Sequence, residues 1–405
     1  MTVYCRMIAT RHLATARPFL RMQMPIASQP SPMVLMIRAI RIILALPYFR
    51  LFGILLWVGI SSLDEGASLT ADETGATVRL KVGNKTTIGR LMEMNNQQAI
   101  ILRRDGRMVE FSRQEIDDIK PISGFKPYTA LSLQNHYRKM FGKGYEVTRT
   151  RHYVVVHPPG MRSQWADPFN ELYNRFQYYF SVRGFSMRPA EFPMIVVVFK
   201  TRGEFNRVAR KDGVENPRSY AGYYSSESNW IVTYEGSHQG GIWESNATLI
   251  HEALHQFAFN HGIHKRWANT PQWCAEGLAA MFEARGVNNA REYRRRVDKL
   301  NPVYMKRLTQ AIKQGQVNGK LKYLIASDRL FGEDIALAYS LSWGLAFYLA
   351  ETHSAEFNQY LQLTAQRDRN ANFTSSDRLA DFAKSFGNDF VMLESHFTQF
   401  VKSLD

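Results

Sequence analysis

Short runs of alternating hydrophobic and polar residues begin at Val78. They occupy 78–82, 87–91, 99–102 and 108–111, and turn residues such as Asp105-Gly106 separate them. A period of two residues is typical of strands that bury one face. Four or five strands so close together predict a small β-barrel that ends near Ile122, and the pattern at 112–115 matches a capping box that would start a short helical turn.

From residue 128 onwards, helical and extended patterns alternate, and then helical patterns dominate. Helical spacing predicts helices at 131–141, 165–182, 201–211, 246–259, 271–284, 289–300, 302–314, 334–352, 354–363 and 376–386. Extended runs predict strands at 145–147, 152–156, 194–199, 222–224 and 230–234. A sheet followed by a helical half predicts an α+β fold with a cleft between the halves.

The first 63 residues have the pattern of an export leader. Arginines precede an uninterrupted apolar run from Leu51 to Ile60, and small residues follow it. Ten apolar residues suit a secretory signal peptide, although a longer stretch back to Ile42 keeps an uncleaved membrane anchor open. The expected organisation is a leader over 1–63, a linker over 64–76, an SH3-like barrel over 77–122 and a larger domain over 128–405. An exported, periplasmic, envelope or extracellular location follows.

Composition supports a folded chain and argues against a nucleic-acid partner. Hydrophobic residues make up 45% of the 405 residues, which is enough for a large core. Seven arginines of the leader inflate the formal charge of +15, and without them 44 basic residues face 36 acidic ones, a net charge of +8. The basic run at 291–296 is interpreted as the solvated face of a helix. Cys274, the one cysteine outside the leader, is expected to be a small buried residue.

The candidate chemistry lies in an H-E-x-x-H motif within the predicted helix 246–259. Residues four apart share one face of a helix, so the imidazoles of His251 and His255 can converge on one ion while Glu252 projects beside them. Two histidines, one carboxylate and water make an open catalytic zinc site. Glu276 follows on the next predicted helix, for which Thr270 is the expected N-cap, and is placed to supply the carboxylate. The alternatives are two ordinary surface histidines or a structural zinc ion.

The pairing of this motif with W-x-x-E-G-L-A at 273–279 resembles the gluzincin clan of zinc metallopeptidases. The resemblance implies a zincin-like domain with His251, His255 and Glu276 as Zn²⁺ ligands and Glu252 as the general base. A narrower resemblance runs from about His152 to Glu351. There the chain is similar to an exported bacterial family known only as domain of unknown function 1570, which implies a fold but no substrate.

Three details qualify the resemblance. Thermolysin-like members carry an acidic residue where this chain has Ala280, so Glu283 or a backbone carbonyl is expected to hold a histidine ligand instead. The resemblance also makes 229–233 the edge strand that pairs with an extended peptide. No G-x-M-E-N segment occurs there, which favours an endopeptidase over an aminopeptidase.

The expected function is hydrolysis of peptide bonds in a peptide or protein substrate, with Glu252 accepting a proton from a zinc-activated water. The developing oxyanion needs a donor, for which Tyr339 and His264 are candidates. A core position is the alternative for Tyr339, and a surface position is the simpler interpretation of His264. The competing function is a non-catalytic envelope binding module with a vestigial or structural zinc site.

Overall fold

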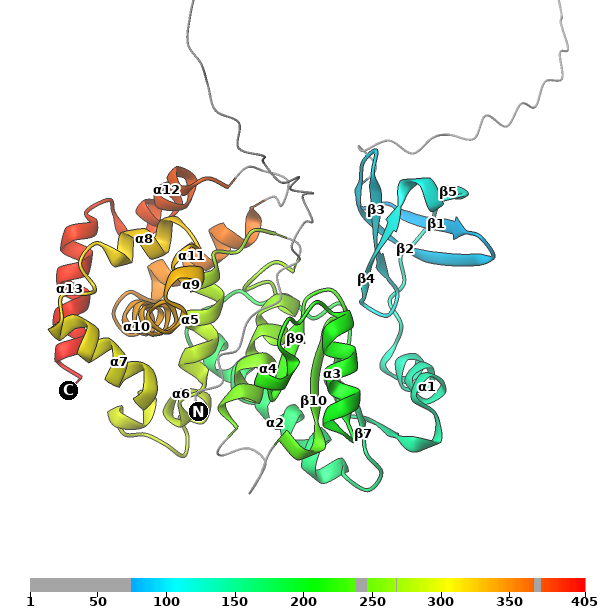
Figure 1. Cartoon of the computed structure of the whole chain (residues 1–405), viewed down its shortest axis with the longest axis horizontal. Coiled ribbons are helices and arrows are strands. Elements are labelled where there is room, and N and C mark those ends of the chain that lie inside the picture. The colour runs from blue at the N-terminus through cyan, green and yellow to red at the C-terminus, as the bar shows by residue number, and fades with distance from the viewer. Residues whose placement is uncertain (1–73, 238–245, 267, 368–372, 405) are drawn as a thin grey trace, which may run out of the picture. The chain divides into compact units, whose positions relative to one another are not determined.

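Five short antiparallel strands form the first sheet of the protein (Figure 1). The computed structural model describes residues 74–237, 246–266, 268–367 and 373–404. The strands are β1 (Thr77–Val82), β2 (Lys85–Met94), β3 (Gln98–Arg103), β4 (Met108–Ser112) and β5 (Asp118–Ile122), in the order β4-β3-β2-β1-β5. Alternate residues such as Val78, Leu80 and Ile101 form its core, as the two-residue period predicts. The order ends at β4 and β5, so the small sheet is confirmed and its closure into an SH3-like barrel stays a prediction.

The helical turn predicted after β4 is present, but without the predicted cap. A 3₁₀ helix, η2, spans Arg113–Glu115, and the side chain of Ser112 makes no capping hydrogen bond. The predicted leader and residues 64–73 of the linker lie outside the described residues, and the proposed domain limits stay predictions. Within the described part of the chain, no helix is both long and apolar enough to cross a membrane.

The second sheet has three parallel strands at its centre and an antiparallel strand at each edge. Its strands are β6 (Glu146–Arg149), β7 (Tyr153–His157), β8 (Met194–Phe199), β9 (Gly222–Ser225) and β10 (Trp230–Tyr234), in the order β6-β7-β8-β10-β9. Every residue of β8 is buried, because helices cover both faces of the sheet.

Alternate residues of the strands pack on different helices. On one face Val155 and Val196 share a core with α2 (Arg162–Ser181) and α4 (Ala247–Asn260). On the other face Val154 and Val197 share a second core with α1 (Ala130–Phe141) and α3 (Arg202–Lys211). A continuous apolar layer therefore holds the motif helix α4 against one face of the sheet.

The edge of this sheet differs from the prediction. β10, which covers the predicted edge strand, lies inside the sheet between β8 and β9. The edge strand beside α4 is β9, because the chain turns back through the hairpin and pairs Tyr224 with Ile231. The strand that could face an extended ligand is therefore β9.

The rest of the chain is helical. Its helices are α5 (Gln272–Phe282), α6 (Arg285–Asn288), α7 (Pro302–Lys313), α8 (Lys320–Ala326), α9 (Leu330–Glu333), α10 (Ile335–Thr352), α11 (Ser354–Gln366), α12 (Ser375–Phe386) and α13 (Phe390–Lys402). Helix α10 is buried along nearly its whole length and lies beside α5 (Figure 1). The architecture is α+β, with two small sheets and a mostly helical C-terminal half, as predicted.

The predicted helix at 289–300 is wrong. Helix α6 ends at Asn288, before this region, which contains turns and one short 3₁₀ helix, η6 (Arg296–Lys299). The chain folds back here so closely that a Cβ on Gly286 would lie 2.6 Å from the backbone carbon of Asp298. The short helices α8 and α9 and the terminal helix α13 were not predicted.

Candidate metal centre

Helix α4 carries the H-E-x-x-H motif in a fully enclosed position. The side chain of Asn246 caps its N-terminus by accepting a hydrogen bond from Leu249 N at 3.2 Å. One face of the helix packs on the second sheet and another on α5. As a result His251, Glu252 and His255 are each at most 2% exposed. Ionisable side chains at such depth need compensating partners.

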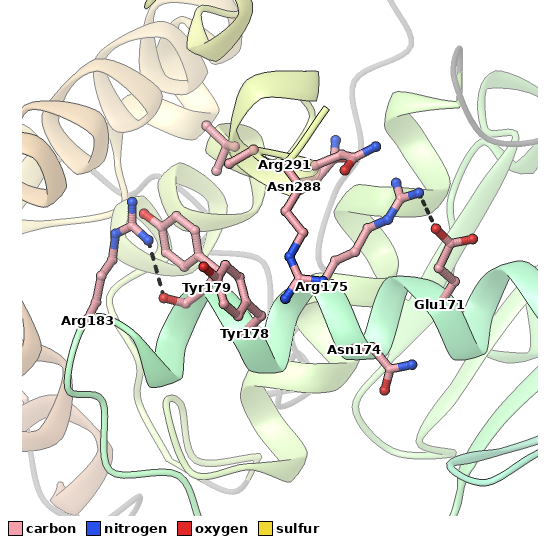
Figure 2. A pocket seen from close by; sticks show the side chains of 11 residues that line it. Glu171, Asn174, Arg175, Tyr178, Tyr179, Arg183, Asn288 and Arg291 are labelled. Atoms are coloured by element: carbon pink, nitrogen blue, oxygen red, sulfur yellow. Dashed lines mark hydrogen bonds and ion pairs between the residues drawn. The ribbon is translucent and has the colours of Figure 1, made fainter. Parts of the chain in front are cut away.

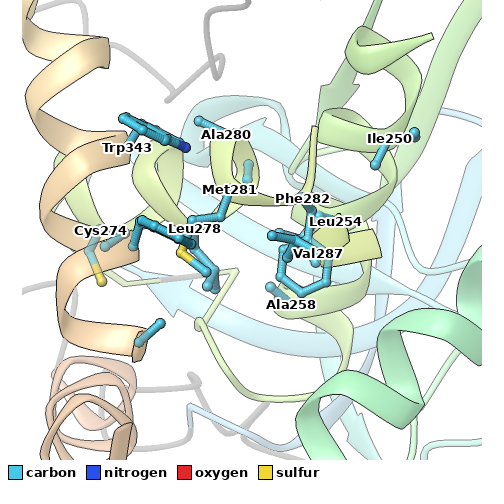
Figure 3. Close-up of a cluster of buried hydrophobic side chains, with 14 of the residues drawn as sticks. Ile250, Leu254, Ala258, Cys274, Leu278, Ala280, Met281, Phe282, Val287 and Trp343 are labelled. Atoms are coloured by element: carbon cyan, nitrogen blue, oxygen red, sulfur yellow. The ribbon is translucent and has the colours of Figure 1, made fainter. Parts of the chain in front are cut away.

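Helix α5 brings Glu276 to the same place because it packs very closely on α10. A Cβ on Gly277 would lie 2.2 Å from the backbone oxygen of Ser342, so only glycine fits between the two helices. Figure 3 shows part of the apolar core to which these helices contribute, including Cys274 and Leu278 of α5 and Trp343 of α10. Cys274 is fully buried, which confirms its predicted role. The helix itself begins at Gln272 with Pro271 as N-cap, so the predicted cap at Thr270 is wrong.

The donor atoms of His251, His255 and Glu276 converge into one group, called the triad below. His251 Nε2 lies 3.0 Å from His255 Nε2 and 3.1 Å from Glu276 Oε2, and His255 Nε2 lies 3.7 Å from the same oxygen. Ligand atoms around a tetrahedral zinc ion with bonds of ~2.0–2.1 Å lie about 3.3–3.4 Å apart. Glu276 Oε1 is buried and has no hydrogen-bond partner among the described residues. The triad could therefore hold one metal ion.

Glu283 supplies the predicted support for a histidine of the triad. Its Oε1 lies 2.8 Å from His251 Nδ1, which confirms the expected contact from a residue three positions beyond Ala280. Asn301 Nδ2 donates to Glu283 Oε2 at 2.7 Å, and the Tyr304 hydroxyl donates to Oε1 at 3.4 Å. This chain of contacts fixes the His251 ring with Nε2 directed at the triad.

The charges of the triad depend on one another. Burial alone would raise the pKa of Glu276, but the contacts with His251 and His255 outweigh it and lower that pKa. Burial alone would lower the pKa of His251, whereas Glu276 and Glu283 together raise it well above its usual value. A cation at the triad would replace the positive charge of His251 and release its proton.

Glu252 lies outside the group of three donors and contacts the edge of the second sheet. Its Oε2 accepts a hydrogen bond of 2.7 Å from the backbone N–H of Tyr224 in β9. This contact fixes one carboxylate oxygen of Glu252 relative to the strand. Sequence reasoning did not find it, since a backbone donor leaves no mark in the side-chain pattern.

The hairpin that carries Tyr224 is tied to α4 through amide side chains. The Tyr224 hydroxyl donates to Asn229 Oδ1 at 2.9 Å, and Asn260 Nδ2 donates to the same oxygen at 2.8 Å. Gln256 Nε2 donates to the backbone oxygen of Asn229 at 2.7 Å. Asn229 also has a φ of 59°, which asparagine tolerates better than most residues. These hydrogen bonds fix the hairpin of β9 and β10, helix α4 and the Glu252 side chain relative to one another.

The two candidate oxyanion donors lie in different surroundings. Tyr339 is 1% exposed, and its ring stacks on Tyr304 and contacts Phe331 edge-on. This position agrees with the alternative prediction that Tyr339 is a core residue. The surface position expected for His264 is wrong, because this residue is also 1% exposed. Burial, together with the charge of His255, lowers the pKa of His264 to about 3. His264 is therefore a neutral imidazole in electrostatic range of the triad.

Part of the chain matches the model of a known family. Residues 245–371 match the model of a family described as "Protein of unknown function (DUF1570)". The match includes α4, α5 and α10 and hence the whole triad. It begins later than the likeness predicted from His152 and extends past Glu351, so residues 152–244 lie outside it. No curated protein matches the chain.

Proposed function

We propose that this protein is a zinc-dependent peptidase of the gluzincin type, with an endopeptidase activity favoured. The observation that carries the proposal is the convergence of His251, His255 and Glu276 beside a fourth buried ionisable residue, Glu252. Burying four ionisable side chains costs free energy unless each has a partner. A metal ion bound by three of them, with the fourth as a catalytic base, explains why all four are buried here.

Zinc is the ion that fits this donor set best. Two imidazole nitrogens and one carboxylate are the ligands of open catalytic zinc sites, and a hard cation such as Mg²⁺ would require more oxygen atoms. The unpartnered Glu276 Oε1 and the two Nε2 atoms are the groups that would hold it. When bound, Zn²⁺ supplies a Lewis acid that lowers the pKa of water and polarises a carbonyl.

The protein's own residues would perform the proton transfers. Glu252 accepts a proton from the attacking water and returns it to the leaving amine, while the Tyr224 N–H keeps its carboxylate oriented. Glu283 holds His251 in the orientation that ligation requires. His264 and Tyr339 are the proposed donors to the oxyanion, and the neutral ring of His264 keeps an N–H for this purpose at neutral pH.

The finer structural predictions belong to the same proposal. The second sheet and the helical half would form a zincin-like domain, and the first sheet an SH3-like barrel. The leader pattern supports a proposed location outside the cytoplasm, with the apolar run 51–60 either removed or kept as an anchor. A peptide or protein would be the substrate.

The test compares the full-length chain with its Glu252→Gln variant. We expect about one zinc ion in each, measured by elemental analysis, because Glu252 is outside the triad. The unaltered chain should cleave unstructured protein substrates, and the variant should lose nearly all of this activity. Glu115→Gln, which changes an exposed carboxylate of η2, serves as the control and should keep this activity.

Two results would reject the proposal. A chain that carries no zinc when purified without chelator has no metal-dependent chemistry. A zinc-bearing chain with equal activity in the unaltered and Glu252→Gln forms does not use this base. Zinc binding without any cleavage would favour the binding module instead.

A further inference from the structure

A second polar site lies between α2 and the turn that follows α6 (Figure 2). It is a cavity of about 350 Å³, called the arginine pocket below because Arg175, Arg183 and Arg291 line it. Tyr178, Tyr179, Val287 and Ala290 contribute apolar surface, and the remaining lining residues are Glu171, Asn174, Asn288 and Asn289. Apolar walls with a few charged groups are typical of small-ligand sites of this size.

The charges of the pocket are not balanced. Glu171 is the one carboxylate in its lining, and it is paired with Arg175 one helical turn away. Arg183 and Arg291 form no ion pair with any carboxylate in the described part of the chain. Two positive charges are thus left facing a pocket that is partly apolar, which attracts an anion.

Stacking orients both of these guanidinium groups. The guanidinium carbon of Arg183 lies 3.7 Å from the ring centre of Tyr179, and that of Arg291 lies 4.5 Å from the ring centre of Tyr178. Arg183 Nη1 also donates to the backbone oxygen of Tyr179 at 3.3 Å. Figure 2 shows the two arginines on either side of the tyrosine rings. A planar group held on an aromatic face keeps its outer N–H donors available to a ligand.

The turn that carries Arg291 is itself held in place. Asn288 is 5% exposed, and its Nδ2 donates to the backbone oxygens of Phe282 and Ala284 at 2.9 and 3.1 Å. Asn289 Nδ2 donates to Glu292 Oε2 at 2.7 Å. The basic run at 291–296, predicted as a solvated helix face, therefore begins on a fixed turn with its first arginine in a pocket.

We propose that the arginine pocket binds an organic carboxylate with an apolar body. The carboxylate accepts hydrogen bonds from one of the two guanidinium groups, Arg183 or Arg291, whose planar geometry it matches, and the positive charge of the other attracts it. The apolar part contacts Val287 and the tyrosine rings. A neighbouring cavity of about 510 Å³ shares Arg175, Asn288 and Asn289 with the arginine pocket. Its lining also includes Glu283, which contacts His251 of the triad. The proposal does not depend on a metal ion.

The first experiment tests the chemistry of the ligand on the full-length chain. N-Acetylphenylalanine is titrated by calorimetry against its neutral amide, which has the same apolar body. We expect saturable binding of the acid with a dissociation constant below about 10 mM and at least about tenfold weaker binding of the amide. Inorganic phosphate should bind more weakly than the acid, because it lacks the apolar part.

The second experiment tests the residues. Arg183→Gln and Arg291→Gln should each weaken binding of the acid at least about fivefold, since each removes one charged donor. Arg210→Gln, an exposed arginine of α3, is the matched control and should bind as the unaltered chain does. A decapeptide ending in phenylalanine, with a free or amidated C-terminus, distinguishes a peptide end from a free acid as the source of the carboxylate.

Several results would overturn the proposal. These are absence of binding, equal binding of acid and amide, phosphate binding as tightly as the acid, or unchanged binding in both arginine variants. The ligand pair is tested on the unaltered chain, so the conclusion does not depend on the folding of a variant.

Discussion

The triad and the arginine pocket hold charged side chains in two contrasting environments. The triad is at most 2% exposed, and Glu276 Oε2 lies 3.1 Å from His251 Nε2 and 3.7 Å from His255 Nε2, so its negative carboxylate is compensated by the two imidazoles. In the pocket, Arg291 is exposed and two like charges are held by tyrosine rings without a counterion. Buried charge is costly unless it is compensated, whereas exposed charge is screened by water and salt.

The difference in burial predicts that the triad and the arginine pocket respond differently to substitution. The triad is part of the packed core, so changes there should affect folding and metal binding together. The pocket lies on a turn and a helix surface, so changes there should affect a ligand far more than the fold. Substitutions in and around the two regions test this distinction.

Gly277→Ala should give the largest loss of stability. The new Cβ would lie 2.2 Å from Ser342 O and 3.1 Å from Ala346 Cβ, and the backbone of α10 cannot yield easily. We expect the free energy of unfolding to fall by about 3 kcal/mol, measured by urea denaturation. Gly332→Ala in α9, where nothing lies within 4 Å of the added Cβ, is the control. Equal stability of the two variants would show that the packing of α5 on α10 is looser than described.

Glu283→Gln should weaken metal binding without unfolding the protein. The change removes the negative charge beside His251 Nδ1 and keeps the shape of the side chain. The dissociation constant for zinc, measured by competition with a chelator, should rise about tenfold or more. Glu292→Gln, which changes an exposed carboxylate of the adjoining cavity, should leave it unaltered. The support role is wrong if both variants bind zinc equally well.

His264 should make the protein sensitive to acid. Its pKa is lowered from 6.5 to about 3, so between these values the unfolded chain binds a proton that the folded chain does not. Stability due to this residue is complete above pH 6.5 and is lost as the pH falls. With a chelator present, unfolding free energies should show a loss of about 2 kcal/mol at pH 5 that is absent in His264→Gln. The exposed His396→Gln should behave as the unaltered chain, and an identical pH profile in all three would contradict the burial of His264.

Arg183→Gln should have the smallest effect on stability. The side chain stacks on Tyr179 but forms no ion pair, so the free energy of unfolding should change by less than about 1 kcal/mol. Thermal unfolding measures this change. A loss as large as that of Gly277→Ala would show that the arginine pocket is part of the core.

Most regular elements could be predicted from the sequence because their apolar periodicity is strong. Strand β8 and helix α4 were placed within one residue of their ends. The failures have local causes. At 289–300 the helical pattern is overruled by the close passage of Asp298 against Gly286, a tertiary contact. Helix α13 begins with exposed Val391 and Met392, at 83% and 52%, which blur its apolar stripe.

The candidate site could be predicted where ligand spacing on a helix is fixed by geometry. His251, His255 and Glu276 meet as the spacing implies, and the contact of Glu283 was anticipated. The burial of His264 and the Tyr224 contact could not be, because both depend on how the sheet edge and the end of α4 pack. The spacing of residues along a helix can be read from neighbouring positions in the sequence. Which strand lies at the edge of a sheet depends on contacts between distant segments.

The contact at Gly277 has a consequence for recognising this site in other genomes. The glutamate at 276 and the glycine at 277 depend on each other. The carboxylate of Glu276 reaches His251 and His255 only because Gly277, which has no side chain, lets α5 and α10 pack in direct contact. A search should therefore require both positions. A distant sequence that keeps the glutamate but carries a larger residue after it is expected to have lost the centre, even with an intact H-E-x-x-H.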